Sequence, residues 1–257
     1  MTIYMQTQKR PVQAAPMSDA ERKARVELAA AYRIFDMLGW TEMIFNHITV
    51  RVPGPEKMFL INPFGLHYSE VSASSLVLID IEGNPLRETQ WPVNRAGFVI
   101  HSAIHGSIAQ AHCVMHTHTT TGVAVACLEE GLSPHNFYGA MLVGRVAYHE
   151  FEGVTVEPGE KERLLRSIGD KPAVILRNHG LLAWGASVPE AFLMLWTLQR
   201  ACDVQISTSR AGAVHPIRPE VFEQTVREGG PAEKRTCDDT FAALQRKLDA
   251  IDPSYRN

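Results

Sequence analysis

The chain has 257 residues, of which 25 are Lys or Arg and 28 are Asp or Glu, so its net charge at pH 7 is −3. This balance disfavours nucleic acid or an anionic membrane surface as a partner. Hydrophobic residues make up 45% of the chain and charged residues 21%, which excludes a disordered or fibrous protein and indicates an ordinary globular one.

Helices and short strands are predicted along the whole chain. Ser18 and Glu21 form a capping-box pattern that starts the first helix, and Gly39 ends it. In chain order we expect a helix over 18–38, strands over 45–52, 58–62 and 77–81, a helix over 98–109, strands over 111–118 and 143–148, a helix over 158–168, a strand over 173–176, a helix over 189–209, a loop over 216–230 and a helix over 240–251. Hairpin-length turns join several strands, which favours a layered α/β sandwich over a doubly wound sheet.

The cysteines and the N-terminal segment indicate the cellular compartment in which we expect the protein. The four cysteines show no CxxC spacing, so neither a disulfide framework nor a zinc ribbon is expected. The N-terminal segment has no apolar signal region, and no stretch approaches the roughly 18 apolar residues of a membrane span. We therefore expect a cytoplasmic protein with a flexible arm over residues 1–17 and one domain over residues 18–257.

Histidines are the residues most suggestive of chemistry. A strand's period of two places His116 and His118 on one face, where two neutral imidazoles can bind zinc or another first-row divalent ion. His179 follows the predicted strand 173–176 in an Asn-His-Gly turn, a usual place for functional side chains. Three histidines with an open coordination position are typical of catalytic metal sites. Taken alone, His179 is better explained as a turn residue bonded to backbone.

Five blocks resemble the class II aldolase/adducin family, and above all its adducin-like branch. They are NHIT at 46–49, INPFGLHYSEV at 61–71, AGFVIHSAIH at 96–105, HTH at 116–118 and NHGLL at 178–182. The resemblance implies a three-layer α/β/α sandwich around a mostly antiparallel sheet. It also implies one divalent metal ion held by His116, His118 and His179, with zinc expected first and manganese, cobalt or iron as alternatives. Family members are commonly homotetramers with sites near subunit interfaces, and they act on small molecules.

The resemblance also indicates site residues, with one departure. Sugar-phosphate aldolases of the family carry an acidic residue at the position of Gly97, and a glycine cannot transfer protons. Their phosphate-binding pair falls on Asn46 and His47, and one of their small residues falls on Arg95, so a phosphorylated sugar is disfavoured. We expect Asn46, His47, Gly65 and Arg95 to bind substrate, with Arg95 suited to a carboxylate.

Two residues are candidates for proton transfer. If residues 97–105 are helical, Gly97, His101 and His105 share one face, which makes His101 a candidate acid or base beside the metal. Solvent-facing or interface histidines are the alternative. Tyr138 falls near the position where the family's aldolases supply a tyrosine proton donor across the subunit interface.

Two functions follow from these residues. The first is a metal-dependent lyase that performs aldol-type cleavage or decarboxylation on a small carbonyl compound or a hydroxy or oxo acid. The second is a catalytically inactive adducin-like binding or scaffold module, which Gly97 favours. The intact histidine trio favours the enzyme, because three imidazoles facing one point are costly to bury without a partner.

Overall fold

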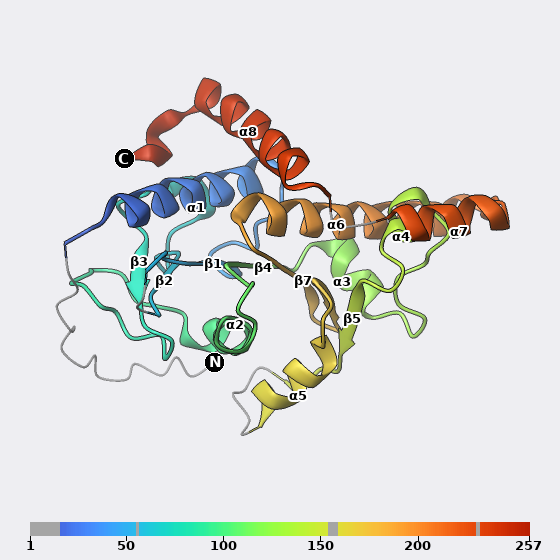
Figure 1. Ribbon diagram of the computed structural model, residues 1–257, viewed down its shortest axis with the longest axis horizontal. Coiled ribbons are helices and arrows are strands. Elements are labelled where there is room, and N and C mark those ends of the chain that lie inside the picture. Colours follow the sequence, from blue (N-terminus) through green and yellow to red (C-terminus); the bar gives the residue numbers. More distant parts are fainter. Residues whose placement is uncertain (1–15, 55–56, 154–158, 230–231) are drawn as a thin grey trace.

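The computed structural model describes residues 16–54, 57–153, 159–229 and 232–257 (Figure 1). Most of the predicted arm over residues 1–17 therefore lies outside the described residues, as does the first residue of the predicted helix 158–168. None of the described helices is both long and apolar enough to cross a membrane.

Eight α-helices and seven strands occur in the described part of the chain. The helices are α1 (Asp19–Met37), α2 (Arg95–Ser107), α3 (Thr120–Ala126), α4 (Phe137–Met141), α5 (Glu160–Ile168), α6 (Val188–Ala211), α7 (Pro219–Glu228) and α8 (Lys234–Ile251). The strands are β1 (His47–Arg51), β2 (Phe59–Ile61), β3 (Val77–Ile79), β4 (Cys113–Thr117), β5 (Val146–His149), β6 (Ala173–Leu176) and β7 (Gly180–Gly185).

The strands form one mostly antiparallel sheet in the order β3-β2-β1-β4-β7-β6-β5. Among the described strands, only β5 and β6 pair in parallel. The predicted hairpin is confirmed, with Val50 opposite Leu60 in the β1–β2 pair. At the centre of the sheet β4 pairs with β1 on one side and with β7 on the other, so the end of β4 is surrounded by neighbouring chain.

Helices cover both faces of the sheet, which confirms the three-layer α/β/α prediction. In Figure 1, α1, α6 and α8 lie above the sheet and α2 and α5 lie below it. Alternation along β4 sends Cys113 and Met115 into the core against α1 and α6, while Val114 joins Ile104 of α2 in the core on the opposite face. Burial of both sheet faces is the main source of stability in such a layered arrangement.

The prediction of a loop over residues 216–230 is wrong, because this segment contains α7. Pro219 occupies the first turn of α7, where proline is tolerated, and no residue of α7 is buried. The sequence analysis also missed α3, α4 and β7. These elements are short, and β7 begins directly after the turn at His179, so none of them shows a hydrophobic pattern long enough to be recognised in the sequence.

Two helix starts also differ from expectation. Ser18 accepts a hydrogen bond from the Glu21 amide (3.1 Å), but the Glu21 carboxylate binds Arg25 and Arg87 instead of completing the capping box. Helix α2 begins at Arg95 rather than at residue 98, because the side chain of Asn94 caps it.

Candidate metal centre

Strand pairing brings His116, His118 and His179 together. His116 is the next-to-last residue of β4, and His118 follows the end of that strand. His179 lies in the tight loop between β6 and β7, in which Asn178 adopts the left-handed conformation (φ 56°). Because β7 pairs with β4, with His116 opposite Leu182, the loop is placed beside the end of β4.

Gly180 allows the close approach of the hairpin loop to β4. A Cβ atom at this position would lie 2.4 Å from the Thr117 carbonyl oxygen and 3.0 Å from Cδ2 of His118. Such contacts are far shorter than ordinary van der Waals distances. The glycine after His179 is therefore required by packing, while the residue that makes the turn with positive φ is Asn178.

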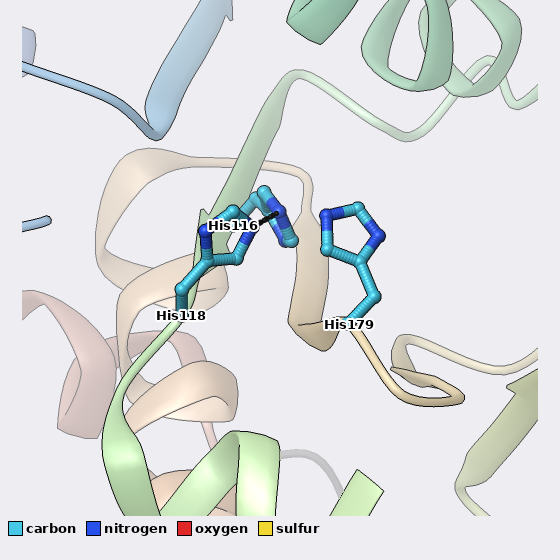
Figure 2. Close-up of side chains that lie close together, drawn as sticks. All are labelled: His116, His118 and His179. Carbon is cyan, nitrogen blue, oxygen red and sulfur yellow. Dashed lines mark hydrogen bonds between the residues drawn. The ribbon is translucent and has the colours of Figure 1, made fainter. Parts of the chain in front are cut away.

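The three imidazoles face one another, as Figure 2 shows. Their ring centroids are 4.5 Å apart for His116–His118 and 4.8 Å apart for the other two pairs. One nitrogen from each ring lies within 4.8 Å of the others. His116 is buried, and the other two are partly buried.

Hydrogen bonding prepares His116 to bind a cation. Its Nδ1 lies 2.8 Å from the Leu181 carbonyl oxygen and must donate to it, so the neutral ring has a bare Nε2. That Nε2 lies 2.7 Å from Nε2 of His118 and accepts a hydrogen bond from it. A divalent cation between the two rings would take the place of this shared proton. Three convergent neutral imidazoles are a donor set that suits a first-row divalent metal.

The electrostatics of the three rings agree with this role. Burial, together with the nearby His118, His179 and His47, lowers the pKa of His116 well below its ordinary value. Burial also lowers the pKa of His118, and burial with the neighbouring His118 lowers that of His179 to about 4. A metal ion binds the neutral imidazole, and all three rings are in this neutral form at pH 7.

A second group of buried polar side chains lies next to the three histidines. His47 is opposite His116 in the β1–β4 pair, with their ring centroids 5.8 Å apart, and the ring of His101 lies 4.1 Å from that of His47. Asn46 precedes His47 with a positive φ of 66°. Both polar atoms of the Asn46 amide and Nε2 of His47 and of His101 are buried without a hydrogen-bond partner among the described residues. Buried polar atoms normally have a partner, so these atoms indicate a binding region for water or ligand.

Gly97 and His47 are packed directly against each other. A Cβ at Gly97 would lie 2.7 Å from Cε1 and 2.8 Å from Nδ1 of His47. The imidazole of His47 thus fills the space that a side chain at position 97 would need. A side chain at position 97, including an acidic one, would therefore clash with His47 in its present position.

The other predicted site residues are placed differently. His101 is completely buried between α2 and β1, so the alternative of a solvent-facing histidine is wrong. Gly65 lies in an exposed turn with φ 111°. The backbone of Arg95 begins α2, while its side chain lies outside what the structure describes. Tyr138 packs on Trp196, with centroids 5.7 Å apart, and beneath Arg200, so within one chain it belongs to the α4–α6 contact and not to the histidine group.

Sequence reasoning missed Thr49, which contacts two of the buried histidines. Its hydroxyl oxygen lies 2.7 Å from Nδ1 of His101 and 2.7 Å from Nε2 of His105. The alternation of β1 was the available signal, because Thr49 lies on the same strand face as His47.

The chain is similar to known proteins in both sequence and fold. Residues 26–206 match the family described as "Class II Aldolase and Adducin N-terminal domain". A crystal structure of an aldolase II superfamily protein from Pseudomonas syringae is 40% identical, with a TM-score of 0.90 over 94% of this chain and 98% of that one. The L-fuculose 1-phosphate aldolase of Glaciozyma antarctica is 28% identical, with a TM-score of 0.79 over 95% and 97% of the two chains.

An adducin also occurs among the relatives. Alpha-adducin of Rattus norvegicus is 40% identical over 248 residues, which are 90% of this chain but 34% of that protein. The chain therefore corresponds to about a third of the adducin.

Proposed function

The chain belongs to the class II aldolase and adducin family, and on this premise we propose that it is a metal-dependent lyase. The reaction is the breaking of a carbon–carbon bond next to a carbonyl or carboxylate group, by aldol-type cleavage or by decarboxylation. The substrate is a small carbonyl compound or a hydroxy or oxo acid. The observation that carries the proposal is the convergence of ring nitrogens from His116, His118 and His179 within 4.8 Å.

His116, His118 and His179 would hold one divalent ion, with zinc as our first choice and manganese, cobalt or iron as alternatives. When bound, the ion supplies a Lewis acid that polarises a substrate oxygen and stabilises the negative charge that develops as the bond breaks. The hydrogen bond from His116 to the Leu181 carbonyl keeps the ring in the tautomer that ligation needs.

The neighbouring polar side chains would bind the substrate. Asn46 and His47 bring buried, neutral hydrogen-bonding groups next to the histidine group, which suits hydroxyl and carbonyl oxygens better than a phosphate. Gly65 remains a proposed substrate contact, and Arg95 remains a proposed partner for a carboxylate. Decarboxylation suits the site because carbon dioxide leaves without a base at position 97 having to remove a hydroxyl proton.

His101 and Tyr138 remain our proposed groups for proton transfer. Because Tyr138 packs against α6 within its own chain, we place its catalytic role at the site of a neighbouring subunit in a homotetramer. This assembly is part of the proposal, and sedimentation of the purified protein measures it.

A binding or scaffold module is the second candidate, favoured by Gly97 and by the similarity to alpha-adducin. A screen of metal-loaded protein against hydroxy acids, oxo acids and aldehydes separates the two. We expect turnover by the unaltered protein and none by His116→Ala. No turnover across the panel, together with tight capture of a defined protein partner, would favour the module instead.

A further inference from the structure

Three buried side chains between β1 and α2 form a continuous row of hydrogen bonds. Thr49 of β1 lies between two histidines of α2, 2.7 Å from Nδ1 of His101 and 2.7 Å from Nε2 of His105. Nδ1 of His105 is 2.8 Å from the carbonyl oxygen of Ala111. The side chains of this row are at most 2% exposed. Such a row, closed off from solvent, has few ways to arrange its protons.

The carbonyl of Ala111 fixes the direction of the row. A carbonyl oxygen only accepts, so Nδ1 of His105 must carry the proton. Burial lowers the pKa of His105 to about 3, so the ring is neutral and its Nε2 is bare. The hydroxyl of Thr49 must then donate to that nitrogen, and the same oxygen is left to accept from Nδ1 of His101.

This direction of the hydrogen bonds determines the protonation of Nε2 of His101. Burial, with His47, His105 and His116 nearby, lowers the pKa of His101 well below its ordinary value, so this ring too is neutral at pH 7. With the proton held on Nδ1, Nε2 of His101 is a bare acceptor. It has no hydrogen-bond partner among the described residues, and the ring lies 4.1 Å from that of His47, beside the metal centre.

Other groups around the row do not change this assignment. Arg51 donates to the backbone carbonyl oxygens of His105 and Ala109, and so contributes a positive charge near the row without touching a ring nitrogen of it. The ring of Phe59 packs on His105 at 4.8 Å. The charge of Arg51 further disfavours protonation of His105.

We propose that Thr49 and His105 are positioning residues that fix His101 as a hydrogen-bond acceptor, and that this acceptor receives an O–H group. In the free protein the donor is a buried water, and during turnover it is a hydroxyl group of the substrate. The second statement rests on the proposed function, whereas the first does not. An acceptor cannot hydrogen-bond to the unprotonated oxygens of a phosphate or carboxylate, so this part of the site selects hydroxyl-bearing ligands.

Neutron diffraction from ligand-free crystals grown in heavy water tests the proposal. We expect deuterium on Nδ1 of His105, on the Thr49 oxygen toward His105, and on Nδ1 of His101. We expect none on Nε2 of His101, and a water whose O–D bond is directed at that nitrogen. Deuterium on Nε2 of His101 would overturn the proposal, because the row would then run in the opposite direction or carry a charge.

Two substitutions at position 49 add a matched pair. Thr49→Val keeps the shape of the side chain and removes the hydroxyl, so the neutron map should show deuterium on Nε2 of His101 in a part of the molecules. Thr49→Ser keeps the hydroxyl and should reproduce the wild-type map, which serves as the control should the valine variant fold poorly. An unchanged tautomer in folded Thr49→Val would contradict the positioning role.

The kinetic readout is separate from the proton map. With metal content unchanged, we expect Thr49→Val to lower kcat by about 10- to 100-fold, by analogy with the loss of partners that orient metal-ligating histidines, and Thr49→Ser to restore it. Equal kcat in both variants would overturn the catalytic part of the inference. The expected deuterium positions without any turnover would leave the row established and count against the proposed lyase activity alone.

Discussion

A methyl group added at Gly97 tests how closely His47 packs against α2. The new Cβ would lie 2.7 Å from Cε1 and 2.8 Å from Nδ1 of His47, which is well inside van der Waals contact. Overpacking of this kind costs about 1–3 kcal/mol. Replacing glycine by alanine inside a helix returns about 1 kcal/mol. The net effect is a free energy of unfolding lowered by up to about 2 kcal/mol.

Gly106→Ala is the matched control, because it lies in the same helix and a Cβ there meets nothing within 4 Å. It should raise stability by about 0.5–1 kcal/mol. Urea unfolding at pH 7 should therefore separate the two variants by about 1–3 kcal/mol. In a His47→Asn background that difference should shrink, since the obstructing ring is gone. If Gly97→Ala were as stable as Gly106→Ala in the wild-type background, the packing argument would be refuted.

Three further predictions concern acid, metal and a buried ion pair. Burial lowers the pKa of His105 to about 3, so on acidification His105 is protonated in the unfolded chain before it is protonated in the folded one. The free energy of unfolding, measured by urea titration, should therefore fall by about 3 kcal/mol from pH 6.5 to pH 4 through this histidine. A free energy of unfolding that does not change over this pH range would contradict the prediction. His116→Ala should abolish stoichiometric zinc binding in elemental analysis, whereas His112→Ala, which changes a histidine outside the cluster, should keep it. Glu21→Gln should lower the free energy of unfolding by about 3 kcal/mol, because the Glu21 carboxylate is buried between two arginines. The control Glu220→Gln, in an exposed ion pair, should change it by less than about 1 kcal/mol. Equal effects of the two substitutions would show the burial argument to be wrong.

Local signals in the sequence were enough for most of the fold. Three elements can be recognised from the residue pattern of their own segment. They are the buried strand over 173–176, the alternating strand over 45–52 and the capped first helix. Helix α7 was not predicted because the segment contributes no buried residue to the core, and because Pro219 stands in its first turn. The division into an arm over 1–17 and one domain over 18–257 remains a prediction.

The candidate site shows the same limit. The spacing of His116 and His118 on one strand indicated their proximity, and the position of His179 after a strand indicated a turn of the kind that often carries functional side chains. The packing of His47 on Gly97 and the contact of Thr49 with two rings depend on how α2 lies across β1. The hydrophobic periodicity of a single helix or strand does not predict contacts between two elements, so these features required the three-dimensional structure.

Anomalous diffraction from crystals grown with zinc, recorded on both sides of the zinc absorption edge, tests the central claim most directly. We predict one strong peak per chain, about 2.0–2.1 Å from a ring nitrogen of each of His116, His118 and His179. A map without a peak between these rings, from crystals that contain zinc at other positions, would contradict the metal centre and the lyase proposed from it.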